Sequence, residues 1–291
     1  MFSIIIPLYN KADYIAETLK SVLNQTYCDY EVIVVNDSST DNSLEVASSF
    51  QDERIHIYTK ENEGVSAARN YGIMHAKYDY IAFLDADDIW ESDYLECQKK
   101  LIEIYPDAGI YSTAFYSLEK GKRKLRNVLI NEHTHFLVHD YFKESVMNGL
   151  SICWTSSLCL KKDMIKEIPM FRVGIKRGED LDLWLRIALN YDVAYLNLPK
   201  VFYRTGLSDS LTSDYSKNGE FPYYEWFNFT SESSYYRKYV ILVVYIHAKN
   251  AFIHHDYDTC LAELWSVKTI AWRFKWAERL LLLVISWIKS K

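Results

Sequence analysis

The sequence lacks three features that mark common classes of protein. Its 33 lysines and arginines are outnumbered by 39 aspartates and glutamates, giving a net charge of -6, whereas a dedicated nucleic-acid binder usually carries a basic excess. The five cysteines have none of the short paired spacings of a zinc site or a disulfide framework. No internal repeat or low-complexity segment stands out. We therefore expect a globular protein of a reducing compartment that binds no nucleic acid.

Two kinds of hydrophobic segment are also missing. The opening residues, MFSIIIPLYN, have no basic stretch and contain Pro7, so they predict a first strand and not a secretory signal. The apolar run within AWRFKWAERLLLLVISWIKSK is shorter than the about 20 residues that a spanning helix needs. Both observations favour a cytoplasmic location. A helix over 268–291 rich in tryptophan and basic residues would suit the inner face of a membrane, while packing on the rest of the chain or on a second subunit is an equal alternative.

Short apolar runs alternate with amphipathic stretches through the first 117 residues, in the order βαβαβαβαβ. This pattern predicts an α/β fold with a mostly parallel, doubly wound sheet of the Rossmann type. Strands and helices become less regular over 118–204, where residues 151–162 predict a strand, and the pattern turns helical and aromatic over 205–291. We expect a first domain over 1–204, divided at residue 117, followed by a mainly helical C-terminal extension.

Carboxylates gather where two predicted strands end. The stretch YIAFLDADDIW places Asp85, Asp87 and Asp88 at the end of one strand, and VIVVND places Asp37 at the end of another. Crowded carboxylates resist burial, so a cation is expected among them unless they cap the next helix. Asp85 and Asp87 are two residues apart and point the same way if the strand continues, and hard oxygen ligands suit Mg²⁺ or Mn²⁺. The ligand site of a doubly wound sheet lies beyond these strand ends.

A third acidic motif lies in RGEDLDLWLRI, which predicts a helix with Leu181, Trp184 and Leu185 on one face. Glu179 and Asp180 fall in its first turn, where the positive end of a helix favours acids. Two interpretations stay open: simple complementarity to the helix dipole, or a general base presented at a helix start.

Five motifs in order, SIIIPLYNKADYIAETLKSVLNQTY, VIVVNDSSTDNS, NEGVSAARNYGI, FLDADDIW and GEDLDLWLR, resemble glycosyltransferase family 2, the inverting enzymes with a GT-A fold. The resemblance spans residues 2–204. It implies transfer of a hexosyl or N-acetylhexosaminyl unit from a nucleotide diphosphate donor, most often a UDP-sugar, to a hydroxyl of a glycan or lipid-linked acceptor. It also implies Mn²⁺ or Mg²⁺ as cofactor, and the synthesis of a bacterial-type surface polysaccharide.

On the donor side, the resemblance assigns roles to five residues. Pro7 and Tyr9 would border the nucleobase, and Asp37 would bind its polar edge. Arg69 would line the same nucleotide pocket. Asp85 would lie near the ribose.

On the reaction side, Asp87 would bind the cation that bridges the diphosphate, and Arg204 would approach the same diphosphate. Asp180 would be the general base, with Glu179 directed toward the acceptor or the sugar. Trp154, by its position before the base helix, is a candidate for the acceptor site.

The match departs from the family pattern after Arg204. Many members carry a histidine two residues after this arginine, where the chain has Gly206. That difference favours a rival interpretation, a catalytically silent sugar-nucleotide or glycan-binding scaffold, whereas Asp85, Asp87 and Asp180 argue for an enzyme. A nucleotidyltransferase would show a glycine-rich basic loop after the first strand, and PLYNKADYI has none.

The turn EKGKRKLR, residues 119–126, carries five basic residues. A solvated loop is the simplest interpretation, with contact to anionic lipid or a charged acceptor as the alternative.

Overall fold

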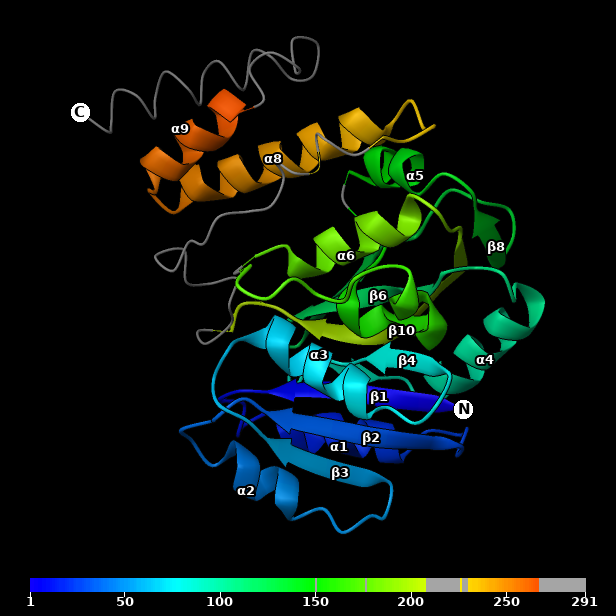
Figure 1. The fold of residues 1–291 in the computed structure, drawn as a ribbon, viewed down its shortest axis with the longest axis vertical. Coiled ribbons are helices and arrows are strands. Elements are labelled where there is room, and N and C mark those ends of the chain that lie inside the picture. Colours follow the sequence, from blue (N-terminus) through cyan, green and yellow to red (C-terminus); the bar gives the residue numbers. More distant parts are fainter. Residues whose placement is uncertain (150, 176, 208–225, 227–229, 267–291) are drawn as a thin grey trace.

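The computed structural model describes residues 1–149, 151–175, 177–207, 226 and 230–266. Within these residues the strands form one ten-stranded sheet in the order β3-β2-β1-β4-β9-β6-β10-β5, with β7 paired to β6 and β8 to β10 (Figure 1). The strands are β1 (Phe2–Leu8), β2 (Tyr30–Asn36), β3 (Ile55–Thr59), β4 (Tyr80–Phe83), β5 (Ile89–Trp90), β6 (Ile110–Glu119), β7 (Lys122–Arg126), β8 (His135–Val138), β9 (Leu158–Lys161) and β10 (Val193–Arg204).

The N-terminal half of the sheet follows the predicted pattern, because β3, β2, β1 and β4 are parallel neighbours. Strand β9 is antiparallel to both β4 and β6 and lies between them, so β6 keeps the direction of β4 without pairing with it. Strand β10 is parallel to β6. The carboxyl ends of β1, β2, β4, β6 and β10 therefore lie along one edge, which we call the carboxyl edge.

Helices cover both faces of the sheet, as a doubly wound fold requires. They are α1 (Ile15–Leu23), α2 (Ser43–Ser48), α3 (Val65–His75), α4 (Tyr94–Ile104), α5 (Tyr141–Asn148), α6 (Glu179–Ala188), α8 (Tyr236–Ile253) and α9 (Tyr257–Ser266), with the short 3₁₀ turns η1 (Thr155–Ser157) and η2 (Lys162–Lys166). Ile4 and Ile6 of β1 share a core with α1, α2 and α4, while Ile5 shares the opposite core with α3, α5, α6 and α8. Alternate residues of one strand thus serve two separate cores. The predicted α/β fold with a helical C-terminal part is confirmed.

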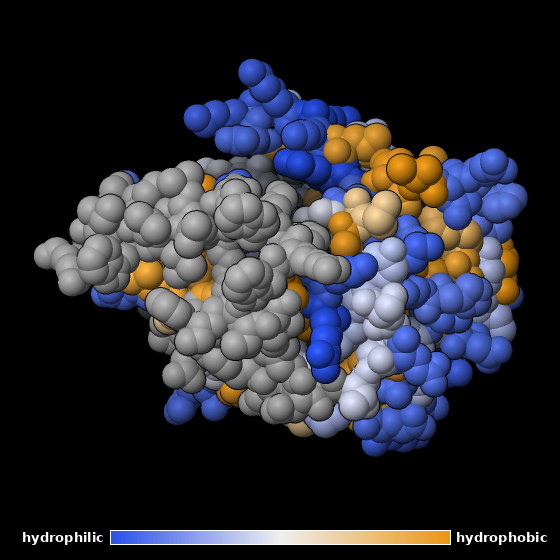
Figure 2. Space-filling model, turned by 90° about the horizontal axis from the view of Figure 1, so that it is seen from above, coloured by the Kyte–Doolittle hydropathy of each residue, from blue (hydrophilic) through white to orange (hydrophobic). Residues whose placement is uncertain are grey.

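Helix α8 packs onto the face that carries α5 and α6, and α9 packs against α8 (Figure 1). Trp226 Nε1 donates to Asp182 Oδ1 of α6 at 2.8 Å, and Tyr236 Oη donates to the Trp226 carbonyl at 2.7 Å. Seen from this end, the described surface is largely hydrophilic, with hydrophobic side chains gathered in smaller patches (Figure 2). The helix predicted over 268–291, and its membrane contact, lie outside the described residues. Nowhere in the described part is a helix both long and apolar enough to cross a bilayer.

Gly72 sets how closely α3 approaches the centre of the sheet. A Cβ at this position would lie 2.5 Å from Cγ2 of Ile5. We expect Gly72→Ala to lower the free energy of unfolding by about 1–3 kcal/mol, because overpacking a tight core outweighs the better helix propensity of alanine. Urea denaturation measures this loss. The double variant Ile5→Ala/Gly72→Ala should lose less than the sum of the two single losses; additive losses would contradict the close contact.

Candidate active site

The loop after β4 holds the three clustered carboxylates. Thr18 Oγ1 of α1 donates to the carbonyls of Ala86 and Asp88, at 2.9 and 2.8 Å, and so ties the loop to α1. Asp88 is fully buried, where it accepts from Ser156 Oγ at 2.5 Å and from the backbone N–H of Arg204 at 3.0 Å. Helix α4 begins at Tyr94, with Asp93 at its cap position. Asp87 and Asp88 therefore do not cap that helix, and Asp88 instead joins β10 to the loop.

Arg69 joins two of the predicted motifs. This arginine lies on α3, is 3% exposed, and donates from Nη1 to Glu179 Oε1 and from Nη2 to Asp85 Oδ1, each at 2.8 Å. Its guanidinium also lies 5.3 Å from the centre of the Phe171 ring. A planar guanidinium suits such a bridge because its donors form a rigid fork. The end of β4 and the start of α6 are thus held together by one buried cation.

Asp180 is the second residue of α6, after Glu179, and its side chain is hydrogen-bonded to the turn η1. Its Oδ2 accepts from Thr155 Oγ1 at 3.1 Å, and its Oδ1 accepts from the backbone N–H of Leu181 at 2.7 Å. Trp154 precedes η1 and contacts the ring of Tyr203 with 4.5 Å between ring centres. The sequence predicted a strand over 151–162, whereas the structure has η1 followed by β9, and the turn is what brings Thr155 to Asp180.

Asp87 and Arg204 lie together at the carboxyl edge. Lys11 Nζ forms an ion pair with Asp87 Oδ2 at 3.0 Å. Arg204 ends β10 and donates from Nη1 to the Asp87 carbonyl at 2.6 Å, and its Nη2 is bonded to Glu17. Two cations, Lys11 and Arg204, therefore border Asp87.

Asp37 lies at the end of β2, and its backbone N–H donates to the carbonyl of Leu8 at 2.9 Å. Its carboxylate accepts from Lys60 Nζ and the Glu63 N–H, both at 3.1 Å, and from the Gly64 N–H at 2.9 Å. Gly64 has φ 91°, a conformation that favours glycine. Backbone donors and one lysine thus offset the cost of burying Asp37.

Pro7 and Tyr9 lie one strand away from Asp37. Pro7 is in register with Val35 of β2. Tyr9 follows β1 and is 45% exposed, so its ring is open to a ligand. The predicted donor residues Pro7, Tyr9 and Asp37 and the predicted reaction residues Asp85, Asp87 and Arg204 therefore share the carboxyl edge.

Burial and mutual repulsion shift the pKa values of the acidic cluster. Burial, together with the adjacent Asp180 charge, raises the pKa of Glu179 to about 7, although Arg69 opposes the shift. Burial raises the pKa of Asp180 as well, again against Arg69. Burial raises the pKa of Asp87 while Lys11 opposes it, and it raises that of Asp88 well above the usual range with help from Asp87 and Asp85. Such perturbed carboxyls in one place are typical of functional sites.

The donor set fits a hard divalent cation that relies on its substrate for most ligands. No cluster of three or more His, Cys, Asp or Glu side chains in the described ranges could form an all-protein metal site. Mg²⁺ and Mn²⁺ commonly take only one or two carboxylates together with substrate phosphates. Asp87, whose partly buried carboxylate is paired with Lys11, and Asp85 two residues earlier are compatible with that arrangement.

Sequence reasoning missed four polar residues of this site: Lys11, Lys60, Thr155 and Ser156. Lys11 follows β1 and Lys60 follows β3. Their acidic partners, Asp87 and Asp37, are distant in the chain. Their only signal was the expectation that a cation accompanies crowded carboxylates. Thr155 and Ser156 lie in what was predicted to be a strand, where their hydroxyls had no assigned partner.

Comparison with known proteins defines the class to which this fold and site belong. The profile of the family described as Glycosyl transferase family 2 matches residues 3–168. The crystal structure of S. aureus TarS 1-349 in complex with UDP-GlcNAc superposes with a TM-score of 0.64 at 17% identity, covering 98% of this chain and 79% of that one. The chain belongs to glycosyltransferase family 2.

Two relatives are informative about the extent of the match. The putative teichuronic acid biosynthesis glycosyltransferase TuaG of Bacillus subtilis is 32% identical over 198 residues, which is 67% of this chain and 75% of the relative. An uncharacterized glycosyltransferase of Rickettsia felis is 35% identical over 193 residues, 64% of this chain and 30% of the relative. The chain thus spans less than a third of the length of that longer relative.

Proposed function

We propose that the protein is a metal-dependent inverting glycosyltransferase that moves a sugar from a UDP-sugar to a hydroxyl of a glycan or lipid-linked acceptor. The observation that carries this proposal is the buried Arg69 bridge, which holds the Asp85 loop and the start of the Asp180 helix at one edge of the sheet. A donor bound at the first would lie next to a base carried by the second.

The donor half of the proposal rests on Tyr9, Asp37 and the Asp85–Asp88 loop. Tyr9 offers an exposed ring for stacking on a nucleobase, and the Asp37 carboxylate can accept from the polar edge of the base. TarS, which has a similar fold, holds UDP-GlcNAc in its crystal structure, and this supports a UDP-linked donor. The name of TuaG supports a place in polysaccharide synthesis.

Asp87 and Asp85 would hold Mn²⁺ or Mg²⁺ against the diphosphate. When bound, the cation would act as a Lewis acid that stabilises the negative charge developing on the departing nucleoside diphosphate. Lys11 and Arg204 border the same place and would add positive charge from the chain itself.

Asp180 would take the proton of the acceptor hydroxyl. Thr155 orients its carboxylate through Oδ2, and burial raises its pKa, which makes it a stronger base than an exposed aspartate. Attack opposite the leaving group breaks the bond from the anomeric carbon to the diphosphate, so configuration inverts. Glu179 would remain the partner of Arg69 and fix the start of α6.

We expect Asp87→Ala to abolish the metal dependence of UDP binding. Wild type should bind UDP more tightly with manganese than with chelator, by tenfold or more on the order expected for a lost charge-assisted contact. Isothermal titration calorimetry with UDP, GDP and CMP measures the effect and the base preference together. Asp163→Asn, at an exposed site in η2, is the matched control and should behave as wild type. Metal-independent binding of UDP by wild type would contradict the proposed role of Asp87.

The rival interpretation, a catalytically silent binding scaffold, predicts a different result. A silent binding module would bind UDP-sugar without releasing UDP, with or without an acceptor. Release of UDP from UDP-GlcNAc or UDP-glucose by wild type, measured by coupled assay, would exclude it.

A further inference from the structure

The hairpin of β6 and β7 concentrates positive charge on an otherwise acidic protein. The sequence favoured a solvated loop here, but residues 122–126 form a strand whose side chains are all exposed. Glu119 is the one acidic residue of this hairpin, and it lies opposite Lys122. The basic residues of the hairpin are Lys120, Lys122, Arg123, Lys124 and Arg126.

Three of these cations lie on one face of the sheet. In the β6–β7 register, Lys122 is opposite Glu119, Lys124 opposite Ser117 and Arg126 opposite Phe115. Opposed residues of an antiparallel pair share a face, and Arg126 Nε confirms this by donating to Ser117 Oγ at 3.2 Å. We call Lys122, Lys124 and Arg126 the basic ladder.

The face that carries the basic ladder continues to the candidate active site. Ser117 is in register with Tyr203 of β10, so Tyr203, Ser117 and Lys124 form one row across three strands. Neighbouring strands lie about 4.8 Å apart, so this row is about 10 Å long. The ring of Phe115 contacts both Tyr203 and Trp154, with centres 6.2 and 5.5 Å apart.

The aromatic cluster Phe115, Trp154 and Tyr203 in turn adjoins the base. Trp154 is followed by Thr155, whose hydroxyl donates to Asp180. The nearby carboxylates, after burial itself, raise the pKa of the Tyr203 hydroxyl. A chain bound at the basic ladder would therefore pass the partly buried rings of Tyr203 and Trp154 at the carboxyl edge before it reaches Asp180.

We propose that the basic ladder binds the acceptor of the transferase, and that this acceptor is a glycan chain bearing phosphate or carboxylate groups. The inference rests on the proposed function and names its acceptor class. Charge supports it, because an anionic chain is repelled by a protein of net charge -6 except where cations gather. Beyond the cations, the partly buried rings of Trp154 and Tyr203 suit the apolar faces of sugar rings.

The arrangement favours a glycan over a lipid surface. The exposed apolar residue of β7, Leu125, lies opposite Tyr116 and therefore on the other face of the hairpin. A membrane-binding surface would need several basic side chains beside the apolar one. On the Leu125 face, β7 places only Arg123, whose guanidinium lies 4.6 Å from the centre of the Phe202 ring. The basic ladder instead shares its face with the aromatic cluster, whose Trp154 precedes Thr155, the partner of Asp180.

The test uses the full chain and three fluorescent oligomers of matched length: a hyaluronan oligosaccharide, a glycerol-phosphate oligomer and neutral dextran. Fluorescence anisotropy should show binding of the two anionic oligomers that weakens with salt, and little binding of dextran. The triple variant Lys122→Gln/Lys124→Gln/Arg126→Gln should bind the anionic oligomers about tenfold more weakly. Since these side chains are exposed, circular dichroism of the variant should match wild type.

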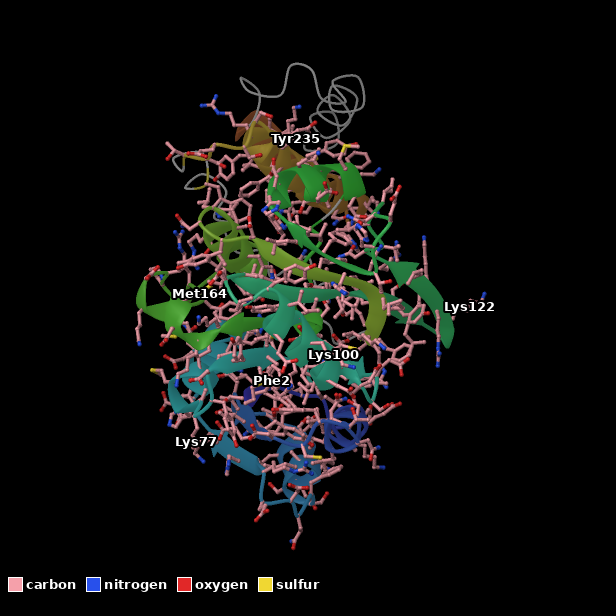
Figure 3. The ribbon with its side chains drawn as sticks, turned by 90° about the vertical axis from the view of Figure 1, so that its right-hand side faces the viewer. Phe2, Lys77, Lys100, Lys122, Met164 and Tyr235 are labelled. Carbon is pink, nitrogen blue, oxygen red and sulfur yellow. The ribbon has the colours of Figure 1, made fainter. Side chains whose placement is uncertain are left out.

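A second triple variant, Lys77→Gln/Lys161→Gln/Lys166→Gln, removes the same charge near the opposite edge of the sheet, where Lys161 is in register with the first residue of β4. Lys77 and Lys122 lie on opposite sides of the molecule (Figure 3). This control should bind the anionic oligomers as wild type does. An equal loss in both variants, or no loss in the first, would overturn the proposal.

Two further measurements distinguish a glycan acceptor from a lipid surface, and this inference from the proposed function. Phosphatidylglycerol vesicles should bind no more weakly to the basic-ladder variant than to wild type; a loss for vesicles alone would replace the glycan with a lipid surface. UDP titration with manganese should be unchanged by the basic-ladder variant. If UDP binds none of the proteins, the proposed function fails, whereas normal UDP binding with unaltered oligomer binding defeats only this inference.

Discussion

Replacing Asp180 by asparagine is expected to reduce sugar transfer about 10²- to 10⁴-fold, the range that general base catalysis contributes. The substitution keeps the shape of the side chain and its place beside Thr155, but it removes the group that would accept the acceptor proton. Binding of UDP with manganese should stay within twofold of wild type, because Asp180 is not among the residues proposed to hold the nucleotide. The measurement is initial-rate release of UDP in the presence of acceptor, paired with UDP calorimetry.

The pH profile gives a second readout for the same residue. Burial raises the pKa of Asp180, so activity should fall on the acid side at a pH above the ordinary aspartate value of about 3.9. This fall in activity at acid pH should be absent from the residual activity of Asp180→Asn. Unchanged turnover in this variant, with Asp163→Asn as the matched exposed control, would remove Asp180 from the mechanism.

Arg69→Met is expected to destabilise the fold by about 3–5 kcal/mol, the cost of removing one partner from a buried ion pair. The arginine is 3% exposed and is bonded to Asp85 and Glu179 at 2.8 Å each. Methionine fills much of the volume but leaves two carboxylates without their cation. Urea denaturation at neutral pH measures the loss. Transfer activity should fall as well, because the bridge positions the donor loop against α6.

The loss in Arg69→Met should depend on pH in a definite direction. The pKa of Glu179 is already raised to about 7 in the folded wild type, against about 4.3 when unfolded. A raised folded pKa gives stability that is complete below pH 4.3 and disappears as pH rises through 7. Without Arg69 the folded pKa rises further, so the variant should lose stability more steeply than wild type between pH 5 and 8.

Arg54→Met is the matched control for this prediction. Arg54 pairs with Asp52 at 2.7 Å, but both side chains are about a quarter exposed, and exposed pairs contribute about 0–1 kcal/mol. A loss at Arg69 no greater than the loss at Arg54 would mean that solvent screens the bridge, and that Arg69 does not position the site.

The sequence was most informative about elements whose contacts are local. Alternating apolar runs predicted β1 to β4 and the helices between them, because each of those strands pairs with a neighbour reached through one helix. The position of β9 was not predictable from such a pattern, since it is inserted antiparallel between β4 and β6 after a separation of many residues. The hairpin strand β7 was also missed, because five basic residues in a short stretch look like solvent-exposed loop whether or not they pair.

The candidate site shows the same division. Carboxylates at strand ends and at a helix start make Asp37, Asp85, Asp87 and Asp180 candidates from the sequence. Their partners do not follow from spacing, because Arg69 lies 110 positions before Glu179 and reaches it only through the packing of α3 against α6. Roles for single residues remain predictions, which the substitutions above test.

The link between Asp182 and Trp226 bears on how members of this family could be recombined. Asp182 is fully buried, only two residues after Asp180 and on the same helix, and it accepts from both Arg186 and the Trp226 indole. Although the sequence pattern changes near residue 204, residues before and after that point pack in one hydrophobic core. A chimaera joined there would leave this buried carboxylate short of one donor wherever the new tail lacks such an indole. An exchange of C-terminal segments between relatives would therefore have to keep the Trp226 indole, which is hydrogen-bonded to Asp182 on the helix that also carries Asp180.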